Sequence, residues 1–279
     1  MTIQNRHTNK SIAEDTLKVL DCGYYVTPYG KRIDISTAQE FAENNTILYT
    51  PEDSDRLIRK RISQPLDTPT DISVTDETTL NAVRRLIKEG YTDCVCLNFA
   101  SAKNPGGGFL GGSQAQEESI ARATGLYYCL LQAKPYYYKN QNFKSFFYTD
   151  NIIYSPGVPI IKDEEGNFLD ELMTTAIITA PAVNAGVVKQ REAERTDEIE
   201  PAMKRRIEKV LTIALANKHS CIVLGAWGCG VFQNEPEVIA KCFKDVIEST
   251  FKNEFQKIEF AIFSRQEKYI KPFYREFGK

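Results

Sequence analysis

The sequence predicts an α/β layered fold, and three observations support this prediction. Short apolar runs of strand length recur along the chain, most clearly at residues 94–99, 176–180 and 221–224. Segments of about 12 to 20 residues with apolar positions at helical spacing alternate with these runs. The chain has 279 residues, 42% hydrophobic and 26% charged, which suits one large globular domain or a domain with an appendage. In such folds, sites lie beyond the carboxyl ends of the strands.

Composition and charge exclude several classes of protein. The net charge is −2, so no chain-wide basic field indicates nucleic acid as a partner. No apolar run approaches the roughly 18 to 20 residues that span a bilayer, and the first ten residues lack a secretory h-region. The seven cysteines indicate buried, reduced thiols, and the two histidines lie beside no nucleophile motif. We therefore expect a cytoplasmic protein, with a nuclear location also open if the source is eukaryotic, that is monomeric and binds neither membranes nor specific nucleic-acid sequences.

The first part of the chain predicts helices and a hairpin. Capping-box sequences at residues 11–14 and 36–39 predict two helix starts, and Gly23 ends the first helix. Between them, residues 24–35 have the pattern of a hairpin that turns at residues 28–30.

A further short helix, rich in Arg and Lys, is predicted around residues 57–62. Pro65 and Pro69 then break the pattern. We place the domain boundary there, with a helical and hairpin extension at residues 1–69 and the main domain at residues 70–279.

The main domain alternates strands with helices. Further strands are predicted at residues 72–74, 151–154, 158–161 and 258–263. Helices are predicted at residues 76–89, at residues 114–132, after a cap at Thr196, and at residues 237–251 with Pro236 at the first position. A polar tail follows the last strand.

The most informative stretch is the loop after the strand at residues 94–99. It contains three consecutive glycines at residues 106–108, and two more at residues 111–112. Glycine adds no side chain to a core, but it allows close approach of the backbone to a ligand. The sequence Gln116-Glu117-Glu118 opens the next helix, so two carboxylates lie within one turn of this loop. This arrangement indicates a functional site.

A second glycine-rich turn occupies residues 225–234, between a buried strand and a helix. Successive N–H groups in such a turn bind phosphate, and two such turns suggest a nucleotide derivative as ligand. Gly106, Gly108 and Gly111 also satisfy the G-x-G-x-x-G pattern of dinucleotide-binding domains. That fold requires an acidic residue about 20 positions later, and residues 127–131 contain none.

The triple glycine, seven residues and then Gln-Glu-Glu resemble the signature of the poly(ADP-ribose) glycohydrolases, and the flanking sequence resembles their bacterial-type branch. The later sequence GAWGCGVFQN is similar to the diphosphate loop of macrodomains. The resemblance covers residues 70–265, with a weaker one to the family's helical extension before them. It implies a macrodomain-like three-layer α/β/α fold with a mixed sheet and an N-terminal, mainly helical extension.

The resemblance also implies roles for individual residues. Glu118 would be the catalytic acid, and Glu117 would position the distal ribose. The residues expected to contact substrate are Asn98, Asn104, Gly106, Gly107, Gly108, Gln116, Gly228, Cys229, Gly230, Val231 and Phe232. The substrate would be poly(ADP-ribose) or an ADP-ribosylated macromolecule and the product ADP-ribose, with no metal and no cofactor.

Cleavage of a ribose–ribose bond passes through an oxocarbenium-like transition state and needs a proton for the departing oxygen. Two carboxylates adjacent in sequence cannot flank one bond, so one acid with a positioned water is expected. Glu118 would hold its proton once substrate excludes water. Two alternatives stay open: a macrodomain reader that binds ADP-ribose without cleaving it, and a hydrolase of mono-ADP-ribosyl groups on protein or nucleic acid. The intact pair Glu117 and Glu118 favours an enzyme.

Other conspicuous residues have plainer interpretations. The aromatic groups at residues 136–138 and 146–148 are expected to pack in the core or a lid rather than to stack on bases. Trp227 lies in the second glycine-rich turn, where it could either pack in the core or take part in phosphate binding. The basic runs at residues 59–61 and 204–206 are expected to be solvated helix faces.

Overall fold

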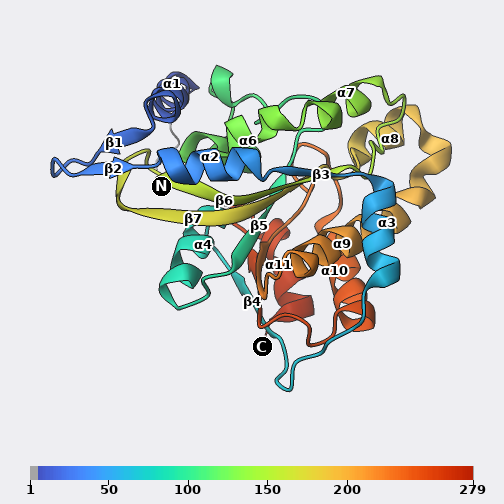
Figure 1. Ribbon diagram of the computed structural model, residues 1–279. Coiled ribbons are helices and arrows are strands. Elements are labelled where there is room, and N and C mark those ends of the chain that lie inside the picture. Colours follow the sequence, from blue (N-terminus) through green and yellow to red (C-terminus); the bar gives the residue numbers. More distant parts are fainter. Residues whose placement is uncertain (1–5, 279) are drawn as a thin grey trace.

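A computed structural model describes residues 6–278. Its centre is a seven-stranded mixed sheet in the order β3-β6-β7-β5-β8-β9-β4 (Figure 1). The strands are β3 (Ile47–Tyr49), β4 (Asp71–Thr75), β5 (Cys94–Phe99), β6 (Ile152–Lys162), β7 (Phe168–Ala180), β8 (Cys221–Leu224) and β9 (Lys257–Ala261). From β7 to β4 neighbouring strands run parallel, whereas β6 is antiparallel to both β7 and β3.

Helices cover both faces of this sheet. One face carries α4 (Thr79–Lys88), α5 (Gln116–Ala123), α6 (Leu126–Gln132) and α7 (Lys134–Asn142). The other carries α9 (Ile199–Ala216), α10 (Pro236–Thr250) and α11 (Glu267–Phe277), with α8 (Ala185–Arg191) at its end. Alternation along β5 serves both layers, because Cys94 and Cys96 pack on the first side and Val95 and Leu97 on the second. The predicted three-layer α/β/α fold is therefore confirmed.

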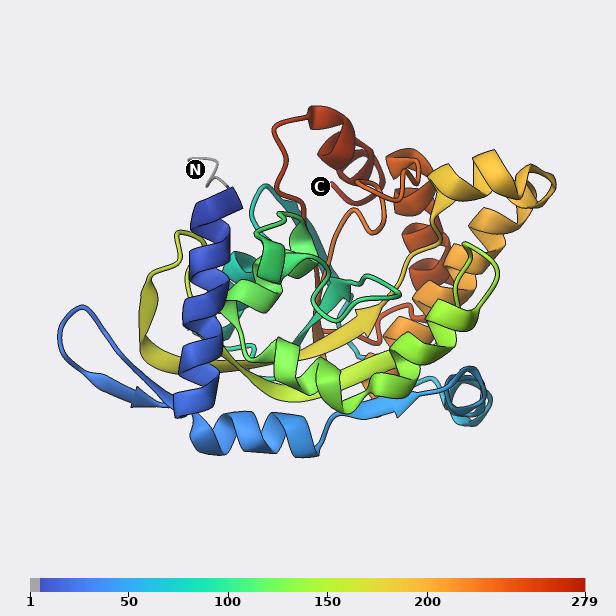
Figure 2. The same ribbon diagram turned by 90° about the horizontal axis from the view of Figure 1, so that it is seen from above.

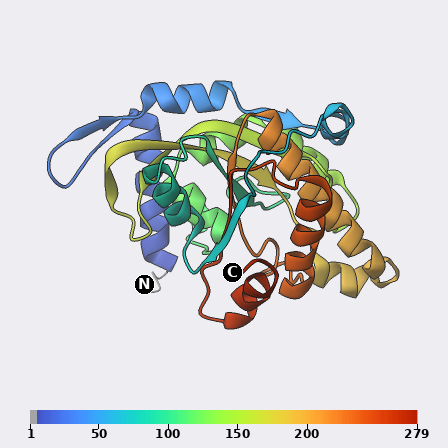
Figure 3. The same cartoon turned by 90° about the horizontal axis from the view of Figure 1, so that it is seen from below.

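The first part of the chain is mainly helical and is tied to the sheet. It contains α1 (Arg6–Cys22), the hairpin of β1 (Tyr24–Val26) and β2 (Arg32–Asp34), α2 (Ser36–Asn44) and α3 (Pro51–Lys60). The hairpin projects from the body beyond one end of α2, and α3 stands beyond the other end (Figure 3). Between α2 and α3, β3 joins the large sheet as the edge strand beside β6.

Helix α1 lies beside the segment that follows the glycine-rich loop (Figure 2). The Arg6 guanidinium donates from Nε to the carbonyl of Gly111 at 2.8 Å, and the Thr16 hydroxyl donates to the carbonyl of Arg122. The N-terminal helix thus supports the loop that carries the triple glycine.

The predicted hairpin and the ending of α1 at Gly23 are confirmed, but both predicted capping boxes are wrong. Helix α1 already includes Arg6, so Ser11 lies inside it. At α2 the Ser36 hydroxyl donates to Asp34, and no side chain caps the helix. A capping box does open α3, where Thr50 and Asp53 bond each other's backbone N–H groups.

Four other predictions need correction. Thr196 does not cap α9: it lies in a 3₁₀ segment at Ala193–Glu198, and the helix begins at Ile199 with no side-chain cap. The helix expected at residues 114–132 is two helices, broken where Thr124 bridges to Ile160 of β6. The strands expected at residues 151–154 and 158–161 form the single strand β6, which has an irregularity between Ser155 and Val158. The expected polar tail contains α11, whose Ile270 and Phe273 are buried.

All seven cysteines are free, and all but Cys22 are buried. Within residues 6–278, no helix combines the length and apolarity needed to cross a membrane.

Candidate active site

The two glycine-rich turns follow β5 and β8, which are adjacent parallel strands. Parallel neighbours deliver their following loops to the same end of a sheet. The structure accordingly brings both turns to one cavity of about 680 Å³, whose wall includes Gly107 and Gly108 from the first turn and Gly228 and Gly230 from the second. This volume suits a ligand of nucleotide size.

Glu118 lies on the cavity wall in the first turn of α5. Its Oε1 accepts a hydrogen bond from the backbone N–H of Gly108 at 2.9 Å. Gly107 has a φ of +60°, and a side chain there would overlap the Glu118 carboxylate and come within 3.2 Å of Glu117 Oε2. Glycine at 107 is therefore what allows the loop to pack directly on both carboxylates.

Gly107→Ala is expected to lower kcat about 100-fold, because the new methyl group displaces the Glu118 carboxylate from its position. The matched control is Gly111→Ala in the same loop, since a methyl group at 111 meets only the Arg6 guanidinium at 3.7 Å, the backbone there is not left-handed, and Gly111 does not line the cavity. That variant should keep its activity within about twofold. Steady-state kinetics and thermal unfolding of both variants make the test, and equal activities would contradict this role of Gly107.

Glu117 is buried at the base of the cavity. Its Oε2 accepts the backbone N–H of Ser101 at 2.6 Å, and its Oε1 accepts Nδ2 of Asn98 at 3.2 Å. Burial raises the pKa of the Glu117 carboxyl to about 8, the charge of Glu118 adds to the rise, and the N–H donors oppose it. The two neighbouring glutamates therefore have different environments, one sunk in the protein and one facing the cavity.

The side chain of Gln116 is engaged by β5 and α4. Its Oε1 accepts the N–H of Phe99 at 2.8 Å, while its Nε2 donates to the carbonyl of Leu97 and the hydroxyl of Thr79. This amide fastens the start of α5 to the end of β5. Gln116 reaches the cavity wall but has both ends of its amide occupied by protein groups.

The two candidate asparagines occupy different places. Asn104 is exposed on the cavity wall, where its backbone N–H bonds the Ser101 hydroxyl. Asn98 is fully buried and does not reach the wall; its Nδ2 also donates to Thr179 Oγ1 at 3.2 Å.

In the second turn, Gly228 has a φ of +73°, and a Cβ there would lie 2.6 Å from Asn234 Nδ2. That amide donates to the carbonyls of Gly228 and Val183 and so holds the turn closed. Val231, which is 79% exposed, and Phe232 line the cavity. Cys229 and Gly106, also expected at the substrate, are buried and do not line it.

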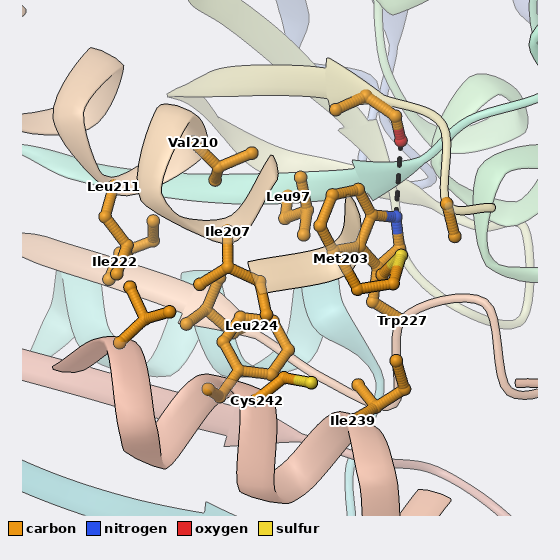
Figure 4. Packing of buried hydrophobic residues seen from close by; sticks show 14 of the residues in the cluster. Leu97, Met203, Ile207, Val210, Leu211, Ile222, Leu224, Trp227, Ile239 and Cys242 are labelled. Atoms are coloured by element: carbon orange, nitrogen blue, oxygen red, sulfur yellow. Dashed lines mark hydrogen bonds between the residues drawn. The ribbon is translucent and has the colours of Figure 1, made fainter. Parts of the chain in front are cut away.

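Trp227 belongs to the core rather than to the cavity. It is fully buried among Leu97, Met203 and Leu224, and Figure 4 shows its indole N–H pointing to the carbonyl of Ala180 at 3.3 Å. The indole therefore anchors the second glycine-rich turn to the layer of α9 and α10.

The far wall of the cavity escaped prediction. It is formed by the start of α4, the turn between β6 and β7, and the segment after β9, with Glu77, Thr78, Glu164, Phe263, Ser264 and Tyr269 among its residues. The Thr78 hydroxyl donates to Glu164, and burial raises the pKa of that carboxyl. Tyr269 could have been found, because the apolar residues of α11 recur at helical spacing.

The basic run at residues 204–206 was expected to be a solvated helix face, but only part of it is. Arg206 is fully buried; it bonds Asp150 and donates to the carbonyls of Phe147 and Pro181. These bonds hold the segment that carries Tyr148, whose ring lies 5.8 Å from that of Phe232 on the cavity wall. Tyr136, Tyr137 and Phe147 are buried as expected, whereas Tyr138 is 70% exposed and does not pack in the core.

The sequence matches the family model of the microbial-type poly(ADP-ribose) glycohydrolase (PARG) catalytic domain over residues 13–163. The chain is similar to the poly(ADP-ribose) glycohydrolase of Thermomonospora curvata, with 37% identity and a TM-score of 0.94 over 97% of this chain and 100% of that one. The structure of that protein bound to the inhibitor ADP-HPD matches with the same identity and coverage and a TM-score of 0.91.

The glycohydrolase of Deinococcus radiodurans in complex with ADP-ribose shows 42% identity and a TM-score of 0.80 over 85% of this chain and 96% of that one. None of the curated proteins compared with the chain matches it.

Proposed function

The chain belongs to the microbial-type poly(ADP-ribose) glycohydrolases, and from that premise we propose that its cavity binds one ADP-ribose unit of the polymer and hydrolyses the bond between two riboses. The observation that carries the proposal is the meeting of both glycine-rich turns and both carboxylates on one cavity. The product would be ADP-ribose, and the substrate poly(ADP-ribose).

The pyrophosphate of the substrate is assigned to the second turn. Gly228, Gly230 and Val231 lie on the cavity wall just before α10, whose N-terminus contributes partial positive charge. Phe232, backed by Tyr148, would pack against the distal ribose. The first turn would close over the same ribose from the opposite side and leave it beside Glu117 and Glu118.

Hydrolysis would proceed with Glu118 as the acid. The C–O bond to the departing ribose breaks as Glu118 gives its proton to that oxygen, and an oxocarbenium ion forms. Water then attacks the anomeric carbon and returns a proton to Glu118. The bond from Gly108 N–H fixes the carboxylate in place for both steps. Glu117 faces Ser101 and Asn98 with N–H donors on both oxygens, which suits it to accept a ribose hydroxyl and not to attack carbon.

Incubation with labelled poly(ADP-ribose) is expected to release ADP-ribose. Parallel incubation with a mono-ADP-ribosylated protein and with a mono-ADP-ribosylated oligonucleotide should release little. Binding of ADP-ribose without release from any substrate would indicate a reader instead. Release from the mono-modified targets alone would indicate that the enzyme uses the same chemistry to hydrolyse mono-ADP-ribosyl groups instead of the polymer.

A further inference from the structure

Asn98 joins the middle of the sheet to the carboxylate at the base of the cavity. It lies opposite Thr179 in the parallel ladder of β5 and β7, and both side chains are fully buried. One amide nitrogen donates to Thr179 Oγ1 and to Glu117 Oε1, each at 3.2 Å. Asn98 has no path to the cavity wall, so its polar group serves Glu117 and not the ligand.

We propose that Asn98, oriented by the Thr179 hydroxyl, is the positioning residue that holds Glu117 ready to accept a hydroxyl of the distal ribose. The inference rests on the proposed function. An ionised carboxylate can only accept hydrogen bonds, and Asn98 and Ser101 each present a donor to it. Each oxygen is fixed by one of these donors, the backbone N–H of Gly106 adds to the stabilisation of the ionised form, and lone pairs remain for the ligand.

Thr179 matters because a side-chain amide has two ends of similar shape and opposite hydrogen-bonding character. The second bond of Nδ2, to Thr179, holds the amide in place while its other N–H reaches Glu117. Without the hydroxyl, the amide loses one of its two bonds and can turn its oxygen toward Glu117. That orientation suits a protonated carboxyl and opposes an ionised one.

The other groups that face Glu117 do not take over this task. Glu118, next to it on α5, opposes its ionisation. Tyr136 and Tyr137 of α7 are buried nearby, and burial raises the pKa of both hydroxyls well above the usual value, so they remain neutral. Their hydroxyls form no hydrogen bond within the described residues.

The consequence is a specific dependence of binding on pH. Burial raises the pKa of Glu117 to about 8, so the carboxyl is largely protonated below that value and ionised above it. A hydrogen bond from a ribose hydroxyl is stronger to the ionised form than to the protonated form. Affinity for ADP-ribose should therefore rise as the pH increases through about 8. Loss of a donor to the ionised form raises the pKa and moves this rise to higher pH.

The test measures ADP-ribose affinity by calorimetry across about three pH units centred on that value, with Thr179→Val, Thr179→Ser and Asn98→Leu compared with the unchanged protein. For Thr179→Val we expect the midpoint to move up by about half a unit, with affinity below the midpoint about threefold weaker. Asn98→Leu should move it by about one unit and weaken affinity about tenfold. Thr179→Ser keeps the hydroxyl and should behave as the unchanged protein does.

Two outcomes would overturn the inference. One is an unchanged midpoint in Thr179→Val, and the other is an equal shift in the Val and Ser variants, which would indicate packing alone. Thermal unfolding will reveal whether Asn98→Leu folds. If it does not, the comparison of Thr179→Val with Thr179→Ser still tests the inference. Polymer cleavage by the unchanged protein is measured separately, so its absence would contradict the proposed function while the binding data still decide the role of Asn98.

Discussion

Replacing Glu118 with glutamine is expected to lower kcat for ADP-ribose release by about 10³-fold, while affinity for ADP-ribose changes by less than about threefold. Glutamine has nearly the same shape and can still accept the N–H of Gly108, so the loop should keep its conformation. It has no proton to give to the departing ribose oxygen. The loss should therefore fall on the chemical step and not on binding.

The same substitution at Glu171 provides the control, because that residue is exposed on β7 and does not line the cavity. Glu171→Gln should leave both kcat and affinity unchanged. The pH dependence of kcat adds a second check, since one limb of the profile should disappear in Glu118→Gln. Retention of more than about a tenth of kcat, or a profile with no limb lost, would exclude Glu118 as the acid.

Arg206→Met is expected to lower the free energy of unfolding by about 3 kcal/mol, at the lower end of the range for a broken buried ion pair. The substitution removes the innermost partner of Asp150 and leaves the carbonyls of Phe147 and Pro181 without their donor. Arg205 and Lys209 still bond Asp150, which limits the loss. Equilibrium denaturation with urea, followed by tryptophan fluorescence of Trp227, measures the effect.

Arg205→Met is the matched control, because Arg205 bonds the same carboxylate from a half-exposed position. Arg205→Met should lower the free energy of unfolding by less than about 1 kcal/mol. Burial opposes ionisation of Asp150, but Arg206 and Arg205 lower its pKa to about 2. The contribution of this ion pair is therefore complete above about pH 4, and it decreases as the pH falls through 2. Equal losses in the two variants would contradict the importance of burial at Arg206.

Much of the fold could be predicted because its strands and helices carry local signals. The apolar runs of β5, β7 and β8 and the proline at the start of α10 are examples. The break at Thr124 could not be predicted in the same way, since its cause is a bridge to Ile160, which is distant in sequence. The prediction of a polar tail is wrong for another reason. The segment has many charged residues, and these obscure the helical spacing of Ile270 and Phe273 in α11.

In the site, too, features set by residues close in sequence could be predicted, and features set by distant residues could not. The glycines of the first turn and the two glutamates are close in sequence, so their proximity in space could be predicted. The burial of Asn98 and Arg206 could not be predicted, because a polar residue cannot be assigned to ligand, solvent or core without its partners. Those partners are Thr179 and Asp150, which lie 81 and 56 residues away.

The outermost position of β3 has a consequence for encounters between copies of this chain. The free side of a strand exposes unpaired backbone groups on which a strand from another molecule can assemble, and this is a route to aggregation. β6 is long and rich in buried isoleucines, so an open side would be hazardous. β3 covers it at Ile152–Tyr154 with only three residues, and α2 packs beside it. The first seventy residues therefore shorten the open side of β6, in addition to supporting the site.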